Sequence, residues 1–98
     1  MDIEFLDTAE YVKWMRGLGA AEQSKVASQL ELLAARGEEL RLPHVRWLGR
    51  GLFELRVVIG QQPRLYFHRV GGDLVVMLTF GRKDTQQRDI ARARRRMP

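Results

Sequence analysis

The sequence contains no cysteine, only two histidines and no long apolar run. Without cysteine the chain can form neither a disulfide nor a thiolate metal site. His44 and His68 lie on separate segments outside any His-Glu-x-x-His motif, so we expect no metal and no cofactor. The longest apolar run, Leu74–Leu78, is far below the roughly 18 residues that a membrane span needs. The first residues, Met1–Glu4, lack the basic and apolar regions of a signal peptide. These absences predict a cytoplasmic protein that does not bind membranes.

Charge is distributed unevenly along the chain. The formal net charge is +5, but residues 1–40 carry four Lys/Arg against eight Asp/Glu, while residues 41–98 carry thirteen against four. A basic half of this kind favours binding to a phosphate backbone or to an acidic protein partner. The length of 98 residues predicts a single domain, 1–98.

Three apolar runs separated by Gly, Pro and Asp predict an antiparallel meander between Gly51 and Phe80. The first two runs, Phe53–Ile59 and Arg64–Val70, alternate apolar and polar residues. Only an odd-length loop of three or five residues around Gly60–Pro63 keeps both apolar sets on one face. That register gathers four polar side chains on the opposite face: Arg56, Arg64, Tyr66 and His68. The third run, Leu74–Phe80, is apolar on both faces, as in a central or doubly covered strand.

The N-terminal half predicts a short edge strand at Ile3–Phe5 and two helices. Asp7 followed by Glu10 has the spacing of a helix N-terminal capping box. The first helix then presents an apolar stripe of core residues: Tyr11, Trp14, Met15 and Leu18. The second helix is expected over Ala20–Arg36, ended by Gly37. We expect these helices to cover the apolar sheet face and to leave the arginine face open.

The remaining segments flank the meander. Val45–Leu48 is expected to be its first strand, followed by a turn at Gly49–Gly51. Thr85 is a candidate N-cap for a basic last helix, Gln86–Arg96, and the residues Arg94–Arg96 are interpreted as solvated.

These residues suit metal-free cleavage of RNA, in which the 2′-OH attacks the adjacent phosphorus. The protein then has to stabilise a more negative phosphorane and to move two protons. Fixed guanidinium and ammonium groups stabilise the phosphorane. The candidates are Arg56, Arg64, Arg82 and Lys83. Proton transfer is assigned to His68, Tyr66 or Lys83, because neighbouring cations lower the pKa of a tyrosine or lysine.

Several segments in the same order resemble the RelE/ParE superfamily of toxin–antitoxin toxins, and within it the HigB-like addiction module killer proteins. They are the Glu-Leu-Arg strand ending at Arg56, the strand beginning Arg64-Leu-Tyr66-Phe, and the segment Lys83-x-Thr85-Gln86-x-x-Asp89-Ile90. The resemblance implies an α+β RelE-like fold: a small, largely antiparallel sheet, an N-terminal helical hairpin on one face and a short C-terminal helix.

The resemblance also implies site residues. Arg56, Arg64, Tyr66 and Lys83 match the catalytic positions of such toxins. The RNA-binding set is predicted to be Arg82, Arg88, Arg92 and His68. The sequence departs from the family because Arg82 stands where near relatives usually have Asp, no Tyr or His follows Lys83, and the last helix is short.

The resemblance implies a toxin that cleaves mRNA on the translating ribosome. It also implies a cognate antitoxin that silences this toxin. The complex of the two proteins is expected to bind operator DNA through the antitoxin. Two alternatives stay open. One is a ParE-like inhibitor of gyrase, although such toxins usually lack the strand arginine and loop lysine present here as Arg64 and Lys83. The other is a non-catalytic nucleic-acid-binding module, which would lose affinity gradually as single cations are removed.

Overall fold

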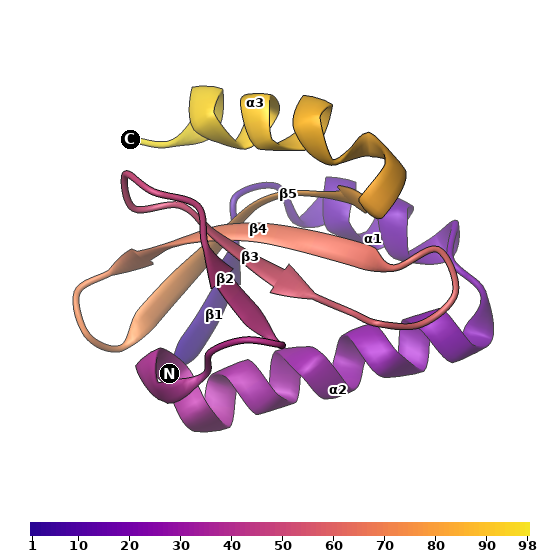
Figure 1. The fold of residues 1–98 in the computed structure, drawn as a ribbon, viewed down its shortest axis with the longest axis horizontal. Coiled ribbons are helices and arrows are strands. Elements are labelled where there is room, and N and C mark those ends of the chain that lie inside the picture. The colour runs from indigo at the N-terminus through magenta and orange to yellow at the C-terminus, as the bar shows by residue number, and fades with distance from the viewer.

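A computed structural model describes residues 1–98. Its helices are α1 (Thr8–Arg16), α2 (Ala20–Arg36) and α3 (Gln86–Arg96). Its strands are β1 (Asp2–Phe5), β2 (Val45–Trp47), β3 (Phe53–Arg56), β4 (Pro63–Val70) and β5 (Leu74–Arg82). The strands form one mixed sheet in the order β1-β5-β4-β3-β2, with α2 and α3 on opposite faces (Figure 1). The expected α+β fold, including the short edge strand near the N-terminus, is confirmed.

The predicted meander is formed by β2 to β5, all paired antiparallel. Leu55 lies opposite Leu65, and Arg56 lies opposite Arg64. The Val57 N–H donates to the Pro63 carbonyl at 3.0 Å, so the loop between these strands is the five residues 58–62. The odd-length register predicted from the alternation is therefore confirmed.

β5 lies between β4 and β1, and it pairs antiparallel with β4 and parallel with β1. Tyr66 pairs with Thr79 whereas Phe67 pairs with Met77, so Leu78 is an extra residue in β5. This β-bulge lets β5 give side chains to both sheet faces: Met77 joins the core under α2, and Leu78 joins the core under α3. The expectation of a doubly covered strand is confirmed.

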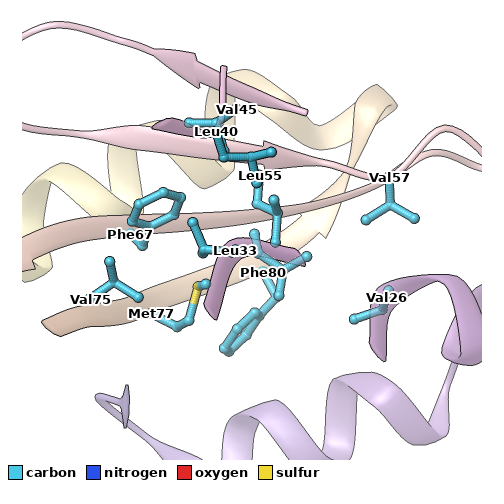
Figure 2. Close-up of a cluster of buried hydrophobic side chains, with 11 residues drawn as sticks. Val26, Leu33, Leu40, Val45, Leu55, Val57, Phe67, Val75, Met77 and Phe80 are labelled. Atoms are coloured by element: carbon cyan, nitrogen blue, oxygen red, sulfur yellow. The ribbon is translucent and has the colours of Figure 1, made fainter. Parts of the chain in front are cut away.

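The two N-terminal helices pack on the apolar face as predicted. Buried side chains of α2, among them Val26 and Leu33, meet strand residues such as Leu55 and Phe67 in the main core (Figure 2). The α1 stripe is half-buried against the same core, and the Trp14 ring stacks on Phe80 with centroids 5.2 Å apart. Asp7 caps α1 by accepting the Glu10 N–H at 3.0 Å. At the end of α2, Gly37 adopts a φ of +56°, a conformation that favours glycine.

The expectation that the arginine face is left open is wrong. α3 crosses that face over β5 and β4, and it builds a second core of Leu52, Tyr66, Leu78 and Ala93. Arg64 and Tyr66 are consequently 1 % and 0 % exposed. The pattern concealed this packing because α3 has few apolar residues. Arginine side chains hold much of the helix instead.

The interpretation of Arg94–Arg96 as solvated is wrong for two of the three. Arg94 donates to the carbonyls of Leu48 and Gly49 at 2.7 and 2.8 Å, which ties α3 to the predicted turn between β2 and β3. Arg96 donates to Glu10 on α1 and to the Leu78 carbonyl. Only Arg95 is exposed.

None of the helices is long and apolar enough to cross a membrane.

Candidate nucleic-acid interface

Three neighbouring strands place one arginine each on the sheet face that α3 partly covers. Arg56 on β3 lies opposite Arg64 on β4. Arg46 on β2 lies opposite Glu54, which is two residues from Arg56 and therefore on the same face. Directly opposite residues have Cβ atoms about 5 Å apart, so Arg46, Arg56 and Arg64 form one arginine cluster. Within it, exposure decreases from Arg46 at the sheet edge, through the half-buried Arg56, to the buried Arg64.

Glu54 is a fully buried carboxylate inside the arginine cluster. One of its oxygens, Oε1, lies 3.8 Å from Arg56 Nε and 3.7 Å from Arg64 Nη1. The other, Oε2, accepts a 2.6 Å hydrogen bond from the Gln86 side chain in the first turn of α3. The contacts with the arginines are charge pairs longer than hydrogen bonds. Glu54 therefore offsets part of the cluster's charge without occupying the donors of Arg56 and Arg64.

The buried donors of this cluster are largely unpaired within the protein. Arg56 Nε, the Nε and Nη1 atoms of Arg64, and the Tyr66 hydroxyl are all buried without a hydrogen-bond partner. Oε1 of Glu54 is equally unpaired. Buried polar groups are nearly always paired, so several orphaned donors in one place need an explanation. Guanidinium N–H groups and a hydroxyl are the donor types that hold phosphate oxygens.

Burial changes the proton chemistry expected of two predicted site residues. Burial, helped by the Glu54 carboxylate, raises the pKa of Tyr66 well above its ordinary value. Burial also lowers the pKa of Arg64, against the opposing pull of Glu54. The expectation that surrounding cations would lower the pKa of this tyrosine is wrong, because desolvation and Glu54 outweigh Arg64. At neutral pH Tyr66 can donate a hydrogen bond but cannot act as a base.

Lys83 and Arg82 lie at the end of the sheet beside the arginine cluster. Arg82 pairs with Pro63, the residue before Arg64, and the Lys83 N–H donates to the Gln62 carbonyl at 3.1 Å. The Arg82 side chain is engaged by Gln61 and by Asp84, 3.5 Å away. Lys83 is exposed and makes no ion pair within 4.0 Å. The loop therefore offers one free ammonium group at this end of the sheet.

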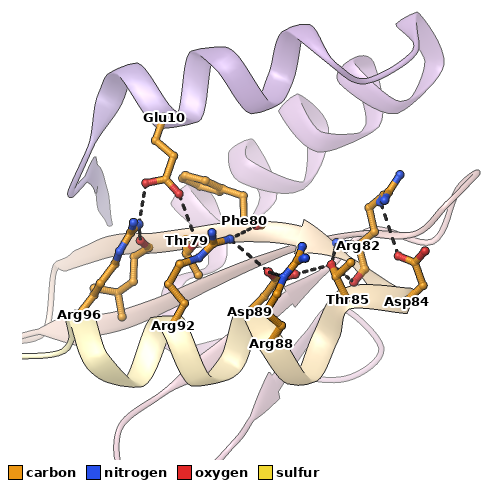
Figure 3. Close-up of polar contacts among 11 residues, drawn as sticks. Glu10, Thr79, Phe80, Arg82, Asp84, Thr85, Arg88, Asp89, Arg92 and Arg96 are labelled. Atoms are coloured by element: carbon orange, nitrogen blue, oxygen red, sulfur yellow. Dashed lines mark hydrogen bonds and ion pairs between the residues drawn. The ribbon is translucent and has the colours of Figure 1, made fainter.

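Arg88 and Arg92 do not join the arginine cluster. Both point from α3 toward α1, beyond the uncovered edge of β5 (Figure 3). There they line a groove of about 400 Å³ with Lys13 and Trp14 of α1. Arg92 also donates to the Phe80 carbonyl at 3.3 Å and pairs with Asp89 at 3.1 Å. The predicted cations are thus divided between two sides of α3.

His68 is also separated from the arginine cluster. It lies four residues beyond Arg64 on β4, which is about 13 Å along an extended strand. This spacing places it at the opposite end of the sheet face from Lys83.

The sequence interpretation missed Arg46, Glu54 and Gln86 as members of this site. The first two could have been found by continuing the strand alternation into β2, since Arg46 lies opposite Glu54. Gln86 gave no such signal, because its contact with Glu54 depends on how α3 crosses the sheet.

The segment that carried the family resemblance positions α3. The buried Asp89 carboxylate accepts a hydrogen bond from the Thr85 hydroxyl and lies against Gly81 of β5. A Cβ atom at Gly81 would come within 1.7 Å of Asp89 Oδ2, so only glycine permits this approach. Thr85 is the N-cap residue of α3, as predicted, but its side chain caps no backbone N–H of the helix.

No group of three or more His, Cys, Asp or Glu side chains lies close enough to hold a metal ion.

The described architecture is that of the RelE fold. A structure of an E. coli toxin RelE mutant in the free state superposes with a TM-score of 0.67, covering 99 % of this chain and 97 % of that one at 16 % identity. An uncharacterized protein of Haemophilus influenzae is 28 % identical over 95 residues, which cover 96 % of this chain and 92 % of the relative. The model of the phage-derived Gp49-like family (DUF891) matches residues 13–98. The chain belongs to this Gp49-like family.

Proposed function

We propose that this chain is the toxin of a type II toxin–antitoxin system and acts as a metal-free endoribonuclease on mRNA, at the translating ribosome. Residues 1–98 form its single toxin domain, of the HigB-like branch, and it works in the cytoplasm. Its partners are mRNA, the ribosome and an antitoxin that also brings the complex to operator DNA. The RelE fold and the Gp49-like family support the toxin class.

One observation carries the nuclease proposal: unpaired donors of Arg56, Arg64 and Tyr66 gather on one sheet face, at the end of which the loop with the exposed Lys83 lies. Arg64 makes one hydrogen bond, from Nη2 to the Gln62 side chain at 3.4 Å. A purely structural arginine would be expected to direct most of its N–H groups at carbonyls, as Arg94 does. Arg56 is half-buried, whereas Arg64 and Tyr66 are packed in the interior with α3 above them. Such preorganised donors stabilise the charge that develops on a phosphorane.

In the proposed reaction the 2′-oxygen bonds to the adjacent phosphorus and the bond to the 5′-oxygen breaks. The products are a 2′,3′-cyclic phosphate and a free 5′-hydroxyl. Arg64, Tyr66 and Glu54 are at most 1 % exposed, so α3 has to move aside before RNA reaches them. Arg56 and Arg64 then hold the non-bridging oxygens, and Tyr66 adds a hydrogen bond. The unpaired Oε1 of Glu54 takes the proton from the 2′-OH, and Lys83 gives a proton to the leaving oxygen.

The RNA strand reaches this site from the exposed side of the cluster, where Arg46 and Arg56 face solvent. Beyond Lys83 it continues past Arg82 into the groove between α1 and α3. There Arg88 and Arg92 contact its phosphates. His68 lies outside this path and is proposed only as a peripheral contact.

The test is to induce the chain in cells without antitoxin and to map new 5′ ends on translated messages. The informative variants are Arg56→Ala and Lys83→Ala, because both side chains reach solvent. Arg64→Ala is a poor choice, since it would leave Glu54 buried with only Arg56 as a charge partner, at a cost of about 3–5 kcal/mol. Lys25→Ala, on the exposed side of α2, is the matched control.

The proposal expects in-frame cuts with wild type and Lys25→Ala, and none with Arg56→Ala or Lys83→Ala at equal protein levels. Growth arrest without cuts would contradict the nuclease proposal and favour gyrase inhibition. Neither cuts nor arrest would favour a non-catalytic binding module.

A further inference from the structure

A second candidate surface lies on the other sheet face, at the free edge of β2. It is a hollow of about 660 Å³ between β2–β4 and the segment 38–42 that follows α2. Its apolar part includes Leu42 and Trp47, which are 63 % and 65 % exposed. Apolar side chains this exposed, adjacent to each other on one hollow, are typical of an interaction site.

The apolar part of the hollow continues into an ordered aromatic surface. Trp47 lies opposite Phe53 in the register, and the Phe53 ring stacks on Phe67 with centroids 5.4 Å apart. The Arg69 guanidinium lies 4.1 Å from the centroid of the Phe53 ring. Tryptophan and arginine are the residue types that dominate binding energy at protein interfaces.

The backbone of β2 adds a second element of recognition. Hydrogen bonds run from Leu48 N to Leu52 O and from Arg56 N to His44 O. The backbone N–H and C=O groups of the even-numbered residues in and beside β2 therefore point toward β3. By the antiparallel alternation, the backbone groups of Val45 and Trp47 face away from the sheet. The Val45 N–H is taken by the Arg41 carbonyl. The N–H and C=O of Trp47 thus remain at the edge, where an extended segment of another protein can pair.

The charges around the hollow determine the kind of segment that fits. Arg41, Arg46 and Arg69 line it, against a single acidic residue, Glu38. A second copy of this chain pairing antiparallel through β2 in the register centred on Arg46 would bring the two Arg46 side chains together, and like charges directly opposite are destabilising. An acidic segment instead meets complementary charge.

We propose that an extended, acidic segment of the antitoxin pairs with β2 at Trp47. One apolar side chain of the segment packs on Trp47 and Leu42, and its carboxylates meet Arg41 and Arg69. The identity of the partner rests on the proposed function, whereas the chemistry of the segment rests on this hollow. Arg56 and Arg64 lie on the opposite sheet face, so this contact anchors the antitoxin without covering them. Arg46, at the edge of the sheet, borders both surfaces.

The experiment measures the affinity of the small protein encoded beside this chain, the proposed antitoxin, for purified variants. Trp47→Ala is expected to weaken binding by about tenfold or more, as truncation of an interface anchor does. Arg69→Glu should also bind the antitoxin more weakly than wild type, and this difference should grow as the salt concentration is lowered. The equally exposed Val58 lies in the β3–β4 loop, and Val58→Ala is the control, with binding unchanged. In the complex, hydrogen exchange of the Trp47 amide should slow.

Unchanged affinity of Trp47→Ala, or an unprotected Trp47 amide, would overturn the proposed docking while leaving the nuclease proposal intact. Loss of single-stranded RNA binding in Trp47→Ala, with antitoxin affinity unchanged, would reassign the hollow to RNA. If the wild-type chain does not bind the antitoxin at all, both the docking and the toxin–antitoxin assignment fail. RNA cleavage by Trp47→Ala is expected at the wild-type rate, which separates this surface from the arginine cluster.

Discussion

Tyr66 illustrates how burial decides the role of a residue whose position the sequence predicts. The strand alternation places it correctly beside Arg64, on the face opposite the apolar set. Its surroundings depend on α3, which covers the hydroxyl and leaves it near Glu54 without a hydrogen-bond partner. A tyrosine in this setting stays protonated, so the role proposed for it in catalysis is a hydrogen bond to the phosphate.

The raised pKa of Tyr66 predicts a loss of stability in alkali. The unfolded chain loses this proton near pH 10, while the folded chain keeps it to higher pH. The unfolding free energy is therefore unaffected by this group below pH 10, and above it falls by at most about 1.4 kcal/mol per pH unit.

The variant Tyr66→Phe should lack the part of the decrease in unfolding free energy above pH 10 that is due to Tyr66. Urea unfolding of both proteins at pH 8, 10 and 11 measures the difference. Burial also raises the pKa of Tyr11, but Tyr11 is present in both proteins and cancels in the comparison. Equal slopes above pH 10 would contradict a buried, protonated Tyr66.

At the scale of elements, α3 is the part of the fold that the sequence could not place. The meander, its register and both N-terminal helices follow from alternation, helical spacing and capping residues, which are local signals. α3 buries only Asp89 and Ala93, and it is held by side chains that reach distant carbonyls and carboxylates. A basic helix with few apolar residues gives no pattern that distinguishes this packing from a solvated end.

The contact between Gly81 and Asp89 predicts a test of how α3 is held. Gly81→Ala forces the Asp89 carboxylate away from β5, because its Cβ would lie 1.7 Å from Oδ2. We expect a destabilisation of about 2 kcal/mol or more, with faster hydrogen exchange throughout α3.

Gly72→Ala is the matched control for that substitution, since nothing lies within 4 Å of its Cβ and its φ is not positive. It should change the unfolding free energy by less than about 0.5 kcal/mol. Urea unfolding compares the two variants, and an equally small effect of Gly81→Ala would show that α3 is held by other contacts.

At the scale of the whole molecule, the uneven charge of the sequence becomes a division between sheet faces. The acidic N-terminal half supplies α1 and α2 on one face, and the basic half supplies the arginine cluster and α3 on the other. Charge asymmetry therefore predicted that the molecule has a basic side, and binding of a polyanion there stays a prediction. The asymmetry could not predict that α3 divides this face, separating Arg56 and Arg64 from Arg88 and Arg92. That division depends on the contacts of Gln86, Asp89 and Arg94 with distant parts of the chain.

The arginine cluster is proposed to act on the phosphate during cleavage rather than merely to bind RNA. The most direct measurement compares Arg56→Ala with wild type on mRNA-programmed ribosomes. It takes the single-turnover cleavage rate from the natural message, and the affinity from a message with a 2′-deoxy nucleotide at the cut, which lacks the attacking group. We predict a rate reduced about 100-fold or more, with affinity changed by less than about tenfold. A rate that falls only in proportion to affinity would contradict a catalytic role for Arg56, and any cleavage of the 2′-deoxy message would contradict attack by the 2′-OH.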